Sequence, residues 1–177
     1  MQALSIRQPW AWLITQGPAV QPPKDAEFRS WDTQYRGWLL VHASKTRDLA
    51  AWVAARAIAA AHGVELPLPA EVATGGVVGA VRVVDCVPAA GCGCPWRYRK
   101  GGADPESGHV LVLADATPVA FMPYRGQQGM FDIPLARKLQ ALEPEAPLPA
   151  SGVRQKNGTL QGTFLHGVPP RRSDAKI

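Results

Sequence analysis

The chain has 177 residues, of which 46% are hydrophobic, and a formal net charge of +5 at pH 7. This length and composition are typical of one globular domain that can bury a sizeable core without staples. No apolar run approaches the roughly 18 residues of a membrane-spanning helix, and residues 1–7 lack the features of a signal peptide. We therefore expect a cytoplasmic protein that has no membrane partner.

The first predicted element is a short helix that begins at Pro9 and stops at Gly17. Proline suits the first turn of a helix, where its missing N–H costs nothing, and glycine suits the end of one. The apolar face of this helix is formed by Trp10, Leu13 and Ile14. A loop with three prolines follows it.

A buried strand and a long helix come next. The apolar run GWLLVHA, residues 37–43, predicts the strand. Residues 46–63 are rich in alanine and predict the helix, with Thr46 as N-cap, Asp48 in the first turn and Gly63 as the stop.

The second half of the chain favours strands. Residues 75–85 and 109–115 are rich in valine and predict two of them, and a glycine-containing turn leads into a third that carries Phe131 and Ile133. Several short strands with few helices favour an α+β fold over a doubly wound sheet. We expect a small, mixed or antiparallel β-barrel with flanking helices.

The C-terminal part differs from the rest in charge. Residues 134–177 hold 7 Lys/Arg and 3 Asp/Glu, whereas residues 1–133 hold 12 and 11. A short helix is predicted over 134–142, and proline, glycine and polar residues dominate from there on. We predict one domain over residues 1–142 and a basic Pro/Gly-rich extension over 143–177. Such an excess is compatible with a polyanionic partner and is weak evidence for one.

Cysteine and histidine give no clear catalytic or metal-binding motif. Cys86, Cys92 and Cys94 are odd in number, and the C-x-C has no matching pair to complete a zinc finger. We expect reduced thiols, no metal and no cofactor. His42 lies in a predicted buried strand, where a hydrogen-bonded core residue is favoured over a general base. The usual phosphate-binding and hydrolase motifs are missing from the sequence.

The stretch KDAEFRSWDTQYRGW, residues 24–38, concentrates charge and aromatic rings before the predicted strand. If it is extended, Glu27, Arg29 and Trp31 share one face. A carboxylate, a guanidinium and an indole could bind a base by hydrogen bonds and stacking. The same residues could equally form a surface salt-bridge cluster, worth about 0–1 kcal/mol per pair.

Four blocks in order resemble the ASCH (activating signal cointegrator homology) domain family, which is similar in fold to PUA domains. They are LSIRQPWAWLI, KDAEFRSWDTQYRGWLLVHASK, GGVVGAVRVVDCV and HVLVL…PYRGQQGMFDI. The family pattern G-x-K-x-x-E-x-R is matched by Gly17, Lys24, Glu27 and Arg29, with a longer segment between the glycine and the lysine. The resemblance implies a compact β-barrel with a cleft beside this motif, and RNA or other nucleic-acid ligands.

The leading hypothesis is therefore a module that binds nucleic acid, RNA in particular, or a modified nucleotide. Cations of the motif region would engage phosphate or base oxygens, Glu27 would read a base N–H, and an indole would offer a stacking surface. The candidate binding residues are Gln8, Trp10, Lys24, Glu27, Arg29, Trp31, Arg36 and Gln128.

The alternative hypothesis is a hydrolase acting at the same cleft, because some members of the family are hydrolases. In a ribonuclease, Lys24 would stabilise developing charge and Glu27 would act as general base. An N-acyl-cytidine amidohydrolase is less favoured, since those relatives have a threonine where this chain has Glu27. A third, less favoured option is a protein-interaction domain that uses exposed tryptophans. The oligomeric state is not predicted.

Overall fold

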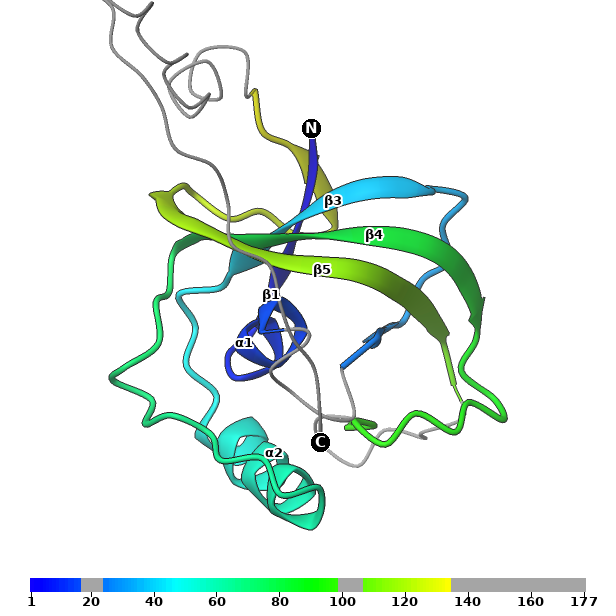
Figure 1. Cartoon of the computed structure of the whole chain (residues 1–177). Coiled ribbons are helices and arrows are strands. Elements are labelled where there is room, and N and C mark those ends of the chain that lie inside the picture. Colours follow the sequence, from blue (N-terminus) through cyan, green and yellow to red (C-terminus); the bar gives the residue numbers. More distant parts are fainter. Residues whose placement is uncertain (17–23, 99–106, 135–177) are drawn as a thin grey trace, which may run out of the picture. The chain divides into compact units, whose positions relative to one another are not determined.

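A computed structural model describes residues 1–16, 24–98 and 107–134 of the chain (Figure 1). The elements are β1 (Gln2–Ile6), α1 (Trp10–Thr15), β2 (Ala26–Arg29), β3 (Gly37–Ala43), α2 (Leu49–Ala61), β4 (Gly76–Pro88), β5 (His109–Pro123) and β6 (Met130–Asp132). The strands form one sheet in the order β2-β5-β4-β3-β1-β6. β1 and β3 are parallel, and every other neighbouring pair is antiparallel.

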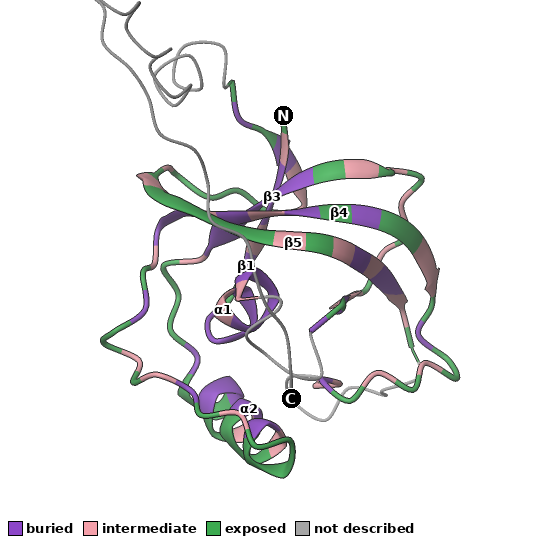
Figure 2. Cartoon of the chain, viewed as in Figure 1, coloured by how far each residue is buried: buried purple, intermediate pink, exposed green. Residues whose placement is uncertain are grey.

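The sheet curves into a half-barrel, and α1 packs against its inner face (Figure 1). The main core lies between them and contains Leu4, Ile6, Leu13, Ile14, Leu39, Val41 and Leu111, each 2% exposed or less. Figure 2 shows this buried centre and the largely exposed outer side of α2. The expected α+β fold, a mixed half-barrel with flanking helices, is confirmed.

Several predicted elements are found where the sequence placed them. β3 covers the predicted strand at residues 37–43. In α1 the three residues of the predicted apolar face are all buried. Trp10 opens this helix, so Pro9 stands at the N-cap, one position before the first turn. The predicted stop at Gly63 is also found, since α2 ends at Ala61 and Gly63 has a φ of +68°, a conformation that glycine adopts readily.

The predicted start of α2 is wrong. Asp48, and not Thr46, is the N-cap: its Oδ1 accepts a hydrogen bond from the Ala51 N–H at 3.1 Å. Thr46 instead donates its backbone N–H to Ser44 Oγ at 3.2 Å, in a turn that precedes the helix. The helix therefore begins at Leu49, and Asp48 stands before the first turn instead of inside it.

The sheet is longer than the sequence suggested. β1 was not predicted, and β5 extends to Pro123, well beyond the predicted end at residue 115. Pro118 falls inside β5, opposite Gly79 and at a shift in register of the β4–β5 ladder. A proline is tolerated in a strand at such an irregularity. Because a proline otherwise argues against a central strand, the sequence pattern did not predict the second half of β5.

The other expectations about chain organisation have different outcomes. Residues 135–142 of the predicted helix, the domain boundary near 142 and the extension over 143–177 lie outside the described residues, as does Gly17. Within the described part of the chain, neither helix is long and apolar enough to cross a membrane.

Candidate functional site

The K-x-x-E-x-R motif lies on and just before β2, which is an edge strand of the sheet. β2 pairs with β5, with Glu27 opposite Leu111 and Arg29 opposite His109. Alternation along a strand puts Glu27 and Arg29 on one face. Arg29 Nη2 lies 3.1 Å from Glu27 Oε1, so the two side chains form an ion pair.

Lys24 holds the other oxygen of the same carboxylate. Its Nζ lies 3.2 Å from Glu27 Oε2 and also donates to the Ala26 carbonyl. The Lys24 side chain is only 2% exposed, and its ammonium lies 5.7 Å from the centroid of the Trp10 ring. Both oxygens of Glu27 are therefore engaged by cations, which fixes the orientation of the carboxylate.

Arg29 ties this motif to β1. Its Nη2 donates a hydrogen bond to the Ser5 carbonyl at 2.9 Å. Its Nε is buried and has no hydrogen-bond acceptor among the described residues. A buried unpaired donor is uncommon and needs an explanation, and a polar ligand is one.

A cavity of about 360 Å³ opens beside the motif. Four of the candidate residues contribute to its lining: Trp10, Glu27, Arg29 and Gln128. The lining also includes the Arg7–Asp48 ion pair, with Nη1 and Oδ2 3.0 Å apart. The lining therefore holds two cations and two carboxylates, each in an ion pair.

The aromatic part of the lining is a stacked pair. The rings of Trp10 and Tyr98 have centroids 5.3 Å apart and an interplanar angle of 25°. Trp10 is 8% exposed, whereas Tyr98 is half-buried and is the more accessible ring. Sequence reasoning missed Tyr98, although the segment WRYRK at residues 96–100, with a tyrosine between two arginines, could have indicated it.

Gln8, another candidate residue, has a structural role in this conformation. Its side chain is buried, and Nε2 donates to the Ala73 carbonyl at 2.9 Å. Its Oε1 accepts from the Trp12 N–H at 3.0 Å. Gln8 therefore joins the start of α1 to the segment before β4 and is not among the residues that line the cavity.

Arg36 and Trp31 also lie outside the cavity lining. Arg36 Nη2 pairs with Asp85 Oδ1 at 2.6 Å, and its Nη1 donates to the Thr33 and Tyr35 carbonyls. The extended segment stops at Arg29, so Trp31 does not share a strand face with Glu27, and it packs partly buried against the main core.

The three cysteines are free thiols. Burial raises the pKa of the Cys94 thiol above its ordinary value, and it does the same for the pKa of Cys86. A raised pKa keeps a thiol protonated, whereas nucleophiles and metal ligands are thiolates. Among the residues that the structure describes, no group of three or more His, Cys, Asp or Glu side chains could hold a metal ion.

A comparison with protein families gives one match. The ASCH domain model matches residues 4–107, which is more than half of the chain. The matched range contains the motif, the Trp10–Tyr98 pair and both helices. A search of curated proteins found none that matches.

A comparison with solved structures agrees with this fold. The crystal structure of ASCH from Zymomonas mobilis matches with a TM-score of 0.50 and 12% sequence identity, covering 80% of this chain and 92% of that one. At 12% identity, the similarity to this structure supports a shared fold and nothing more. The family match, supported by the fold, shows that the chain belongs to the ASCH domain family.

Proposed function

We propose that this protein binds RNA or a modified nucleotide by taking a base into the cavity beside the K-x-x-E-x-R motif. The observation that carries the proposal is that a stacked aromatic pair and an ordered carboxylate–guanidinium pair line one cavity. Its volume, about 360 Å³, falls in the range of about 300–1,000 Å³ found for small-molecule sites.

The polar groups of the cavity match what a base presents. Glu27 can accept from a base N–H or exocyclic amine, Arg29 can donate to a base carbonyl, and the Gln128 amide can do either. The pairing with Lys24 and Arg29 holds Glu27 in place before a ligand arrives. Groups that are ordered in advance lose less conformational entropy on binding, which raises affinity.

Stacking would come mainly from Tyr98. Trp10 lies against Tyr98 and beneath the Lys24 ammonium, so its own faces are largely occupied. Tyr98 is the ring left accessible, and Trp10 supports it from behind. Stacking of a base on an aromatic side chain is worth about 1–3 kcal/mol.

Hydrolysis at the same cleft is the alternative, and the contact between Lys24 and Glu27 is the observation that would favour it. In this arrangement, however, the two groups that the reaction needs are bonded to each other, and the second Glu27 oxygen is bonded to Arg29. Lys24 is almost fully buried and is not among the lining residues. Binding without turnover is therefore the better supported function.

The test is incubation of the purified protein with a panel of nucleosides, modified nucleosides and short RNAs at low salt. Mass spectrometry of the mixture then reports both retained ligands and cleavage products. Binding predicts retention of an unchanged ligand, and hydrolysis predicts products that disappear with Glu27→Gln. Neither retention nor turnover would overturn both.

Matched aromatic variants locate the ligand. Tyr98→Ala should weaken binding by roughly 5-fold to 150-fold, the equivalent of one lost stack. Trp38→Ala is the control, because Trp38 is 46% exposed and does not contribute to the cavity lining. Equal losses in the two variants would show that the ligand does not stack in this cavity.

A further inference from the structure

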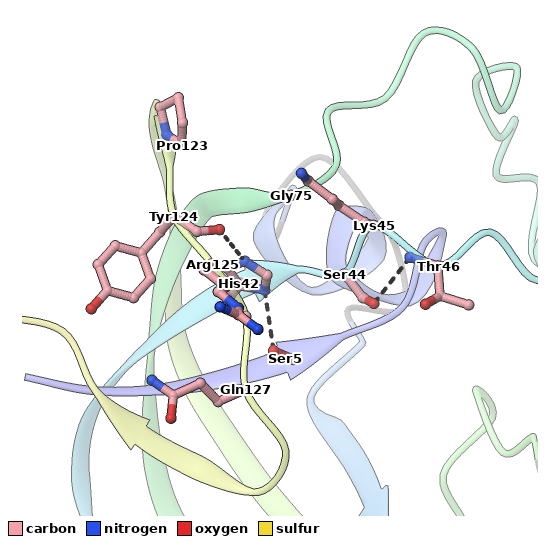
Figure 3. Close-up of a pocket in the computed structure, with 11 residues that line it drawn as sticks. Ser5, His42, Ser44, Lys45, Thr46, Gly75, Pro123, Tyr124, Arg125 and Gln127 are labelled. Carbon is pink, nitrogen blue, oxygen red and sulfur yellow. Dashed lines mark hydrogen bonds between the residues drawn. The ribbon is translucent and has the colours of Figure 1, made fainter.

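A second and larger cavity has a volume of about 680 Å³. Figure 3 shows residues that line it. The two cavities share four lining residues: Ser5, Ser44, Thr46 and Gln127. The lining of the second cavity comes from segments that are far apart in the sequence. They are β1, the end of β3 with the residues that follow it, Gly75, and the end of β5 with the residues that follow it. The two cavities are therefore two halves of one cleft, which we call the motif half and the second half.

The floor of the second half is a hydrogen-bonded histidine. His42 Nε2 lies 3.0 Å from the Tyr124 carbonyl, and its Nδ1 lies 3.2 Å from Ser5 Oγ (Figure 3). A carbonyl can only accept, so Nε2 donates the hydrogen of its bond to Tyr124. His42 is 2% exposed, which confirms the expected hydrogen-bonded core histidine.

The backbone at Gly126 closes over this floor. A Cβ added at Gly126 would lie 2.5 Å from His42 Cε1 and 2.8 Å from Ser5 Oγ. Only a residue without a side chain lets the segment 124–127 pack so closely on the histidine. This contact sets where Arg125 and Gln127, on either side of the glycine, stand relative to the cavity.

The rim carries two cations, Lys45 and Arg125, which are both exposed. Neither has an ion-pair partner among the described residues. The Lys45 stem lies across Gly75, where an added Cβ would come within 2.7 Å of Lys45 Cε, so the missing side chain of Gly75 makes room for the lysine. Figure 3 shows Lys45 extending toward Gly75.

The charge of the two halves is therefore different. The motif half has two cations and two carboxylates in its lining, and they are paired. The second half has Lys45 and Arg125 and no carboxylate among its described lining residues. Unpaired cations above a concave polar surface raise the local concentration of an anion.

We propose that the second half binds a phosphate group of the same ligand whose base lies in the motif half. This rests on the proposed function and deepens it, since the ligand would then be a nucleotide or an RNA and not a free nucleoside. Lys45 and Arg125 would supply the charge, and the Ser44 and Thr46 hydroxyls and the Gln127 amide would supply further donors. These are the side chains that usually contact phosphate and sugar oxygens.

Adjacency supports one continuous ligand. Ser5 belongs to both halves: its carbonyl accepts from Arg29, and its hydroxyl bonds to His42. A base held at Arg29 and a phosphate held in the second half would thus lie on either side of Ser5. A nucleotide can span that step without any rearrangement of the protein.

The test compares a nucleoside, its 3′- and 5′-monophosphates and a short RNA by titration calorimetry. The protein is used as the full chain, in wild-type form and as the double variant K45Q/R125Q. The wild type should bind the better monophosphate at least tenfold tighter than the nucleoside. In K45Q/R125Q this ratio should fall to near one, while nucleoside affinity changes less than twofold.

A matched control separates this site from the overall charge. The variant R56Q/R82Q also removes two positive charges, from side chains that do not line either half. It should keep the ratio of monophosphate to nucleoside affinity. The salt dependence of RNA binding should become shallower in K45Q/R125Q by about 0.7 per lost phosphate contact and change less in the control.

The outcomes distinguish the two proposals. If monophosphates or RNA bind but K45Q/R125Q keeps the wild-type ratio, or R56Q/R82Q loses it equally, the phosphate site is wrong and the proposed function stands. If only nucleosides bind, the phosphate site is again wrong. If nothing binds at low salt, both are wrong. All four substituted side chains are at the surface, so thermal unfolding is expected to show folded variants.

Discussion

The two halves of the cleft are built in opposite ways. In the motif half each charge has a partner, and Lys24 behind it is almost fully buried, so its geometry is fixed by ion pairs inside the protein. In the second half the cations stand at the rim, and a buried, hydrogen-bonded histidine forms the floor. Side chains held in fixed positions suit recognition of the shape of a base, whereas exposed cations without a partner suit attraction of an anion. Basic side chains therefore serve different purposes depending on whether an ion pair inside the protein already neutralises their charge.

The largest effect should come from breaking the ion pairs of the motif half. Glu27→Ala leaves Lys24 buried without its carboxylate and leaves Arg29 with only the Ser5 carbonyl. Removing one partner of a buried pair costs about 3–5 kcal/mol, so we expect a loss of unfolding free energy of that order. Urea unfolding followed by circular dichroism measures it.

The control for Glu27→Ala is Arg36→Ala. The Arg36–Asp85 pair is short but its side chains are 37% and 52% exposed, and exposed pairs contribute about 0–1 kcal/mol. A loss below 1 kcal/mol in Glu27→Ala as well would mean that the motif half is solvated and its charges are not held in advance.

A smaller effect is expected where the second half is most tightly packed. Gly126→Ala would place a methyl group against His42 and Ser5, and overpacking of this kind costs about 1–3 kcal/mol. It should also shift the 124–127 segment and weaken nucleotide binding more than nucleoside binding. Gly93→Ala is the control, because nothing lies within 4 Å of its added Cβ. Equal stability of the two variants would contradict the close contact on the histidine.

The wall of the motif half gives a third test, at the start of α2. Asp48→Ala removes the helix cap and the Arg7 ion pair, so a loss of about 1–2 kcal/mol is expected. Thr46→Ala, at the position that the sequence favoured as the cap, should cost much less, because its side chain does not cap the helix. A larger loss of stability in Thr46→Ala than in Asp48→Ala would show that Thr46 is the N-cap after all. The measurement is thermal unfolding of the wild type and the two variants.

The motif half was the easier half to predict, because its key contact is local. Glu27 and Arg29 are two residues apart, and strand alternation alone puts them on one face. Its aromatic part was not local: Trp10 and Tyr98 meet only because the chain after β4 returns to α1. Gln8 and Arg36 were predicted to bind the ligand because their side chains can form hydrogen bonds. In the structure both are bonded to residues that the sequence could not identify as their neighbours.

The second half could not be predicted from pattern at all. Ser5 and His42 face each other because β1 and β3 are parallel and in a register that puts these two residues side by side. β1 was not recognised as a strand, so nothing in the sequence suggested that pairing. Lys45 and Arg125 lie outside the K-x-x-E-x-R motif, and only the fold brings both into the lining of one cavity.

The smallest expected effect concerns the pKa of the Cys94 thiol, which lies close enough to Lys24 for the two groups to interact electrostatically. Burial raises the pKa of Cys94, and the nearby Lys24 ammonium lowers it less than burial raises it. The thiolate should therefore form at a higher pH in the folded chain than in the urea-unfolded chain, whose cysteines ionise near pH 8.5. Alkylation by iodoacetamide, followed by peptide mass spectrometry across a pH series, reads this midpoint.

The pH series separates ionisation from access. Poor access slows alkylation by the same factor at every pH, whereas a raised pKa moves the midpoint of the rate profile upward. Coinciding midpoints in folded and unfolded protein would show that Cys94 is only shielded. A midpoint above the unfolded one would show that the region behind Lys24 is poorly solvated. The same poor solvation would make the Lys24–Glu27 pair costly to break. A raised midpoint for Cys94 should therefore go together with a large loss of unfolding free energy in Glu27→Ala.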